Sequence, residues 1–329
     1  MADREFVFSN PDVQRLIREK FVPLAMDDWY LRRQNDPEGK FFREMTRESP
    51  RGNAGDATRQ GRYVFTASGR FLGFNNNRGP ERLVAMLEDA LAKWEKLPDS
   101  DRKTAGPVSQ PTREARYDRR PPSGGAVVKV HTRVLERAGS GKFQPVTPPA
   151  RSDDDFQHRG FGAAVDHLWL TADDLKALVP PAGSAVGKAL PVPPAIAQRI
   201  ARYHLVDGTR GEPPHWSKEE AKSVSLTLTP ASAGRANLAG EFHMETKDGS
   251  RGFQGTLTGW IDTKDGALSD FTAVATGDQW GESPLTRGAR PGRSPIGFAF
   301  RLCPQPAPAD SIPPQAARWL DGYYDPARN

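Results

Sequence analysis

The densest group of residues that could do chemistry lies in residues 201–216, with the sequence ARYHLVDGTRGEPPHW. Its chemically useful members are His204, Asp207, Arg210, Glu212 and Trp216. A histidine beside a carboxylate can act as a general base or bind a metal ion, and an arginine can hold an anion. His204, Asp207, Arg210 and Glu212 are therefore candidate catalytic residues, and Trp216 is a candidate ligand-binding residue.

Histidine is also the commonest protein ligand for transition metals. The chain has six histidines, all of them after residue 125: His131, His158, His167, His204, His215 and His243. His167 and His204 each lie in an apolar context close to an aspartate, which suits a metal ligand, a general base or a hydrogen-bonded core residue. One hypothesis is a copper or zinc ion held by His131, His167 and His204. The sequence contains no HExxH pattern, so no motif supports that choice of ligands.

A second group of candidates lies in the arginine-bearing loop predicted for residues 278–293. Trp280, Arg287 and Arg290 are its candidate ligand-binding residues, because guanidinium groups recognise carboxylates and phosphates and an indole can wall a pocket. The alternative is that these arginines hold neighbouring turns together through ion pairs. The ligand-binding hypothesis predicts one concave site that gathers His167, His204, Asp207, Arg210, Glu212 and Trp280.

Composition excludes several classes of function. The chain has a formal charge of +5 and a pI near 9.3, but its arginines are interleaved with acids, so we expect no nucleic-acid partner. The single cysteine, Cys303, excludes an internal disulfide and dithiol redox chemistry. No apolar run approaches the ~20 residues of a membrane span. The predicted location is secreted or periplasmic if a leader has been removed, and otherwise cytoplasmic.

The first part of the chain predicts an α/β unit. Pro11 opens an amphipathic helix, a strand is expected at 21–26, and a helix broken at Pro37 follows to residue 45. Residues 63–66 and 71–74 predict a hairpin with Gly69 at its turn, and a strong helix runs from Pro80 to about Trp94.

This order of elements, carried by SNPDVQRLIREKFVPLAMD and GRYVFTASGRFLGF, resembles the thioredoxin-like fold over residues 1–97. Active members of that family have a Cys-x-x-Cys pair and a cis-proline before the hairpin. Here residues 1–97 contain no cysteine, and Gln60-Gly61 stands at the proline position. The resemblance therefore implies a redox-inactive scaffold.

The remainder predicts a linker, a β-rich domain and a tail. Residues 98–125 are rich in Pro, Ser, Arg and Asp and read as a linker, while residues 304–329 form a Pro- and Ala-rich tail. Between them, residues 126–303 predict short helices and a mostly antiparallel, curved sheet or partial barrel. The segments DHLWLT, RYHLVDGTRGEP and GARPGRSPIGFAF resemble an uncharacterised group of bacterial proteins, which implies a domain arrangement and no activity. The predicted fold class is α+β.

Three hypotheses about function follow. The leading one is a non-catalytic adaptor that joins a redox-inactive thioredoxin-like domain to a β domain that binds a protein partner or a small anionic ligand. The second is an enzyme whose site lies between residues 201–216 and 278–293. The third is a copper- or zinc-binding protein. The sequence predicts no particular reaction, substrate or oligomeric state.

Overall fold

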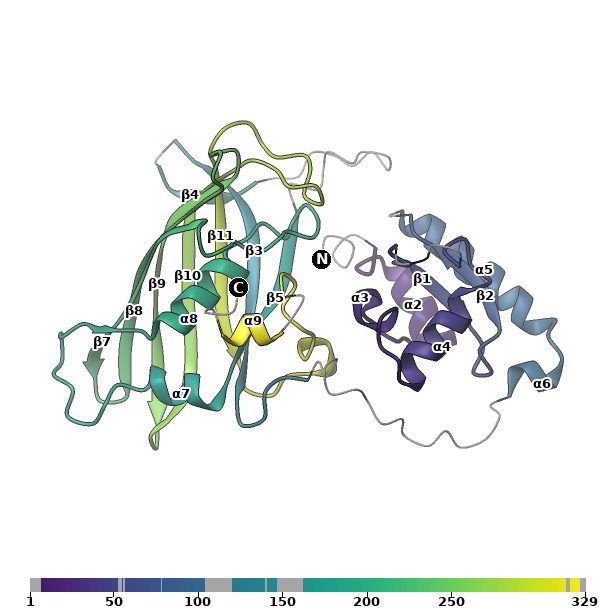
Figure 1. The fold of residues 1–329 in the computed structure, drawn as a ribbon, viewed down its shortest axis with the longest axis horizontal. Coiled ribbons are helices and arrows are strands. Elements are labelled where there is room, and N and C mark those ends of the chain that lie inside the picture. The colour runs from purple at the N-terminus through teal and green to yellow at the C-terminus, as the bar shows by residue number, and fades with distance from the viewer. Residues whose placement is uncertain are drawn as a thin grey trace. The chain divides into compact units, whose positions relative to one another are not determined.

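The computed structural model describes residues 7–52, 55, 57–77, 79–103, 120–139, 141–146, 162–317 and 320–325. The chain divides into two compact units, which lie within residues 3–118 and 119–329 (Figure 1). This division falls inside the predicted linker, of which residues 104–119 lie outside the described part. No helix among the described residues is long and apolar enough to cross a membrane.

The N-terminal unit contains short helices and one hairpin. Its elements are α2 (Pro11–Lys20), α3 (Asp28–Leu31), α4 (Pro37–Thr46), β1 (Arg62–Phe65), β2 (Phe71–Asn75), α5 (Pro80–Glu95) and α6 (Asp99–Arg102). β1 and β2 pair antiparallel, and α5 packs on β2 and on α2. The side chain of Asn10 accepts hydrogen bonds from the backbone N–H groups of Asp12 and Val13, so α2 begins where the sequence predicts.

The predicted helices and hairpin of this unit are confirmed, whereas the strand predicted at residues 21–26 is wrong. Residues 21–27 form no regular element, and Val22 and Leu24 are 88% and 65% exposed. Phe21 and Met26, at its two ends, pack against small cores of the unit, but no described strand of the unit pairs with this segment. Without a partner strand, apolar residues alone do not form a strand. The thioredoxin-like resemblance stays a prediction.

The C-terminal unit is built on a nine-stranded antiparallel sheet. Its strands are β3 (Ala126–Arg137), β4 (Phe143–Pro145), β5 (Ala163–Leu170), β6 (Leu190–Pro191), β7 (Ala221–Ser232), β8 (Arg235–Glu245), β9 (Gly252–Lys264), β10 (Ala267–Trp280) and β11 (Ser294–Cys303). They lie in the order β4-β3-β11-β10-β9-β8-β7-β6, and β5 pairs with the remaining length of β3. The described strands therefore form an open sheet and not a closed barrel.

Glycines allow close approach of neighbouring strands in the middle of the sheet. Gly255 of β9 and Gly277 of β10 are directly opposite each other, and a Cβ on either would come within 3 Å of the other's Cα. A Cβ on Gly259 would lie 2.7 Å from the Cβ of Ala273. Larger side chains at these positions would force the strands apart.

Helical segments cover the inner face of the sheet (Figure 1). They are α7 (Ala172–Leu178), α8 (Pro194–Arg199), the π-helix η3 (Ile200–His204) and α9 (Leu320–Tyr324). A 3-10 turn, η4 (Pro308–Asp310), lies between β11 and α9 in the chain. η3 contacts β5 near one edge of the sheet and β7 and β8 near the other. The helices thereby bury the apolar face that an open sheet would otherwise expose.

The predicted helix at 195–205 is present but changes type part of the way along. The backbone N–H of Leu205 donates to the carbonyl of Ile200 at 3.2 Å, a spacing of five residues. π-helical turns are rare in proteins, but many of those that occur lie at functional sites. This turn fixes the directions of Arg199, Arg202 and His204, which all lie inside the unit.

Candidate functional site

His204 belongs to a buried series of hydrogen bonds. Its Nδ1 lies 3.0 Å from Oδ2 of Asp166, and its Nε2 lies 2.7 Å from the hydroxyl oxygen of Tyr323. The same hydroxyl oxygen accepts the backbone N–H of Trp169 at 3.0 Å, and Oδ1 of Asp166 accepts the backbone N–H of Gln315 at 2.8 Å. The imidazole is 0% exposed.

One assignment of protons gives every polar hydrogen in this series a partner. Tyr323 donates its hydroxyl proton to Nε2 of His204, and the imidazole donates its Nδ1 proton to an ionised Asp166. Burial alone would raise the pKa of the Asp166 carboxyl, but the hydrogen bond from His204 and those from the backbone of Gln315 and His167 outweigh it and hold the pKa below its ordinary value. Burial raises the pKa of Tyr323 well above 10.

The buried series joins the C-terminal segment to the sheet. Tyr323 is 0% exposed and keeps its proton, so the phenol cannot act as an accessible nucleophile in this conformation. Tyr203 donates to the carbonyl of Gly322 at 3.0 Å, and the guanidinium of Arg199 donates to the backbone carbonyl of Tyr323 at 3.1 Å while pairing with Asp174. These contacts give His204 a structural role.

The structure does not bring the three predicted metal ligands together. His167 and Asp166 are adjacent in β5 and therefore point to opposite faces of the sheet. Nε2 of His167 lies 3.5 Å from Oδ1 of Asp310, and His131 is exposed on the same outer face, whereas His204 contacts Asp166 on the inner face. Within the described residues, no group of three or more His, Cys, Asp or Glu side chains is arranged to hold a metal ion. The predicted site of His131, His167 and His204 is therefore wrong.

Asp207 and Arg210 form a buried pair directly after η3. Nε of Arg210 lies 2.5 Å from Oδ2 of Asp207, while Oδ1 of Asp207 accepts the backbone N–H of Thr209 at 2.9 Å. The two terminal nitrogens of Arg210 donate to the carbonyls of Thr286 and Gly281. The arginine thereby holds the loop at 281–293 against the segment after η3 through carbonyl acceptors, whereas the alternative predicted ion pairs between the two turns.

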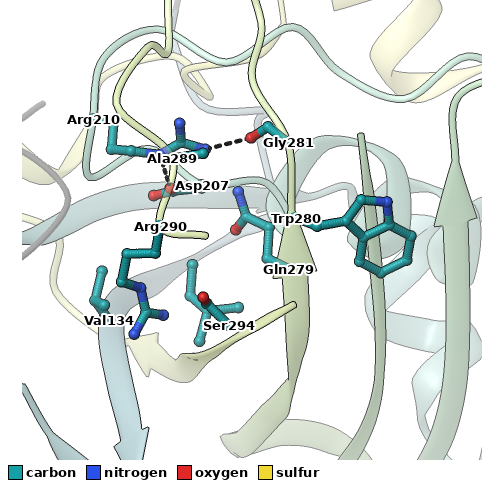
Figure 2. Close-up of a pocket in the computed structure, with 10 residues that line it drawn as sticks. Val134, Asp207, Arg210, Gln279, Trp280, Gly281, Ala289, Arg290 and Ser294 are labelled. Carbon is teal, nitrogen blue, oxygen red and sulfur yellow. Dashed lines mark hydrogen bonds and ion pairs between the residues drawn. The ribbon is translucent and has the colours of Figure 1, made fainter. Parts of the chain in front are cut away.

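A pocket opens beside this pair, where β3, β10 and β11 meet the loop (Figure 2). Its cavity volume is about 20 Å³, and it is open to solvent on one side. The residues that line it are Val134, Asp207, Arg210, Gln279, Trp280, Gly281, Ala289, Arg290, Ser294 and Ile296. The pocket thus unites Asp207 and Arg210 with Arg290 and with Gln279, which sequence reasoning missed.

Two polar groups of the pocket retain hydrogen-bonding capacity. The side-chain amide of Gln279 points between Arg210 and Arg290 (Figure 2) and has no partner among the described residues. Arg290 donates from its terminal nitrogens to the carbonyls of Leu135, at 2.7 Å, and Pro295, which leaves its Nε–H uncommitted. Burial lowers the pKa of Arg290, partly offset by the charge of Asp207. The pocket therefore presents two guanidinium groups and one carboxylate.

Four other predicted site residues lie away from the centre of this pocket. The ring of Trp280 points away from Gln279 and Arg290 (Figure 2), and its Nε1 donates to the carbonyl of Gly249 at 3.0 Å. Trp280 thus lines the pocket, but side chains alternate along β10, so Gln279 and not the indole ring occupies the inner face. The others are Trp216, which is buried in the main core, Glu212, which is half-buried in a loop, and Arg287, which is exposed.

Tyr323 is the residue that sequence reasoning overlooked most completely. It lies 119 residues after His204 in a tail that composition alone describes as Pro- and Ala-rich. The available signal was the aromatic pair Tyr323-Tyr324, because such side chains near a chain end commonly anchor it to a core. The tail was also expected to pack through Trp319, which lies outside the described residues.

Comparison with known proteins identifies no relative: no family model, curated protein or solved structure matches the chain. The function of the chain must therefore be inferred from its own geometry.

Proposed function

We propose that this chain is a non-catalytic binding protein and that its C-terminal unit binds a small anionic ligand in the pocket between Arg210, Gln279 and Arg290. The observation that carries the proposal is the uncommitted amide of Gln279 between two guanidinium groups. An anionic ligand would balance the second guanidinium, since Asp207 already balances Arg210.

The size and composition of the pocket favour a small ligand with one acidic group. The cavity volume of about 20 Å³ has room for little more than a water molecule, so the loop must shift to admit a ligand and only a small one would fit. Val134 and Ile296 add apolar side chains to the polar lining, which suits a carboxylate on a short hydrocarbon body.

The enzyme and metal alternatives have less support. The four candidate catalytic residues do not all share a site. Asp207 and Arg210 pair beside the pocket, whereas His204 is hydrogen-bonded inside the core and Glu212 does not line the pocket. Asp207 also lacks a neighbouring histidine that could exchange protons with it in the described pocket lining. The histidines proposed as ligands of copper or zinc lie on two faces of the sheet.

The N-terminal unit enters the proposal as an adaptor without redox activity. The whole chain has one cysteine, Cys303, so this unit cannot form the dithiol that thiol–disulfide exchange requires. We propose that it keeps a thioredoxin-like scaffold for contact with a protein partner. An insulin-reduction assay free of contaminating thioredoxin should detect no turnover.

Calorimetric titration of the full chain with acetate, propionate, succinate and inorganic phosphate tests the binding proposal. We expect saturable binding of at least one carboxylate and a loss of about tenfold in affinity for Gln279→Leu, since one hydrogen bond to a charged ligand contributes about 1.5 kcal/mol. The side chain of Gln279 makes no hydrogen bond to the described residues, and its backbone pairing in β10 does not depend on the side chain, so this variant should remain folded.

Arg287→Gln is the matched control, because Arg287 is an exposed cation in the same loop that does not line the pocket. Its affinity should stay within about twofold of the unsubstituted chain at 0.15 M salt, where exposed charges are screened. Equal losses in the two variants, or no carboxylate binding at all, would refute the proposed pocket.

A further inference from the structure

Arg202 is a fully buried cation whose charged end lacks hydrogen-bond partners. It lies in η3 and is 0% exposed. Its Nε donates to the carbonyl of Trp216 at 2.8 Å, but neither terminal nitrogen has a partner among the described residues. A guanidinium group stays charged at all physiological pH values, so up to four N–H groups of this cation remain unsatisfied.

The surroundings of Arg202 compensate this charge only weakly. The guanidinium carbon lies 5.6 Å from the centroid of the Tyr203 ring, a distance at which the attraction between cation and ring is modest. Within the described residues, no carboxylate lies within ion-pair distance of its nitrogens. Burial of an unpaired ion is among the most unfavourable arrangements in a protein interior, so this environment is incomplete without an anion.

A second buried guanidinium, that of Arg251, lies in the same region. Its guanidinium carbon is 4.0 Å from the centroid of the Trp216 ring, and the side chain is 9% exposed. It donates to the carbonyl of Pro214 at 3.4 Å and lies 3.9 Å from a carboxylate oxygen of Glu220. Glu220 also accepts the backbone N–H of Ser217 at 2.8 Å, so its charge is shared.

His215 connects the two arginines to the surface. Its ring stacks on that of Tyr203 at 4.8 Å and is half-exposed. Burial lowers its pKa, and the positive charges of Arg202 and Arg251 lower it further, while Glu220 and the backbone of Ala316 act in the opposite direction. Two guanidinium groups and a histidine therefore surround a region that Glu220 balances only in part.

We propose that Arg202, His215 and Arg251 form a second anion site, which binds the carboxylate or phosphate group of a small ligand on the inner side of the sheet. The two terminal nitrogens of Arg202 offer the parallel donors that match two oxygens of such a group. The site shares no residue with the pocket of Gln279 and Arg290. The half-exposed side chains of His215 and Glu220 form its rim.

Anion binding at this site is coupled to a proton. The bound anion offsets the charges of Arg202 and Arg251, which raises the pKa of His215 above its value in the unoccupied site. The imidazole therefore takes up a proton when the anion binds. Affinity should increase as the pH falls through the range between the two pKa values of His215.

Calorimetric titration of the full chain with inorganic phosphate and with acetate at pH 7.5, 6.5 and 5.5, with ionic strength held constant by chloride, tests this proposal. We expect saturable binding of at least one anion that strengthens towards pH 5.5. Arg202→Met should weaken it by at least tenfold, whereas Gln279→Leu should leave this binding event unchanged. His215→Gln should remove the pH dependence of acetate binding, because acetate stays ionised over this range whereas phosphate itself changes charge.

The two anions distinguish the source of the ligand group, since a site that takes only phosphate points to a phosphoryl ligand and one that takes only acetate points to a carboxylate. If Arg202→Met does not fold, Arg202→Lys provides the second variant, because it keeps the charge but loses the paired donors. No saturable binding in the unsubstituted chain, or unchanged binding in the folded Arg202 variant, would overturn the proposal. Loss of binding in Gln279→Leu alone would support the proposed pocket and reject the second site.

Discussion

Tyr323→Phe removes one buried oxygen atom from the junction between α9 and the sheet. The ring can stay in place, but Nε2 of His204 loses its donor and the backbone N–H of Trp169 loses its acceptor. Each polar group left buried without a partner costs about 1–3 kcal/mol, so the two together cost roughly 2–6 kcal/mol. Partial relaxation of the phenyl ring favours the lower half of that range. We expect a loss of about 2–4 kcal/mol in the free energy of unfolding of the C-terminal unit.

Hydrogen exchange measured by mass spectrometry at increasing urea concentration is the suitable assay, since peptides from β5 report on the C-terminal unit separately from the rest of the chain. Tyr324→Phe is the matched control, because that side chain is half-buried and its hydroxyl makes no hydrogen bond to any described residue. The control should lie within about 0.5 kcal/mol of the unsubstituted chain. Equal stabilities of the two variants would refute the stabilising role assigned to the Asp166, His204 and Tyr323 series.

Three further variants test other parts of the C-terminal unit by the same assay. Arg199→Met leaves the buried Asp174 without its guanidinium and should cost about 3–5 kcal/mol, whereas Lys176→Met, beside the exposed Asp173, should change little. Gly281→Ala should cost about 1–3 kcal/mol more than Gly288→Ala, since both glycines have φ near +80° but only a Cβ at 281 would meet the carbonyl of Ser250, at 1.9 Å. The pKa of His215 is lowered on folding from 6.5, so in buffers without phosphate or carboxylates stability is fully present above pH 6.5 and falls below it. His215→Asn should show a smaller loss of stability between pH 7 and pH 5, and an unchanged loss would contradict this assignment.

The strands of the C-terminal unit were predictable because their local pattern and their final environment agree. In β3 the buried residues Val128, Val130, Thr132 and Val134 alternate with more exposed neighbours, which is the pattern that the sequence shows. The capping box at Thr171 and Asp174 is likewise formed by two reciprocal hydrogen bonds. The strand predicted at residues 21–26 failed because apolar residues there indicate a strand only if a partner strand is available.

The candidate site was harder to predict because its contacts depend on the direction of individual side chains. Asp207 and Arg210 were found from local spacing, and their pairing needs only a tight turn. The ring of Trp280 points to the opposite face of β10 from Gln279, and His167 points to the opposite face of β5 from Asp166. In each strand the neighbouring residue, and not the predicted one, faces the interior. The partner of His204 comes from a distant part of the chain, which no local pattern encodes.

The π-helical turn explains why charged residues are so concentrated inside this unit. A regular helix turns by 100° per residue, so it would spread Arg199, Arg202, Tyr203 and His204 around its axis and direct some of them to solvent. Because η3 lies across the inner face of an open sheet, its whole circumference is enclosed, and each polar side chain must find a partner there. Arg199 contacts Asp174 and three carbonyls, and His204 contacts Asp166 and Tyr323. Arg202 alone among these four has a charged end without partners in the described structure, so the functional interpretation of η3 depends on what binds to that guanidinium.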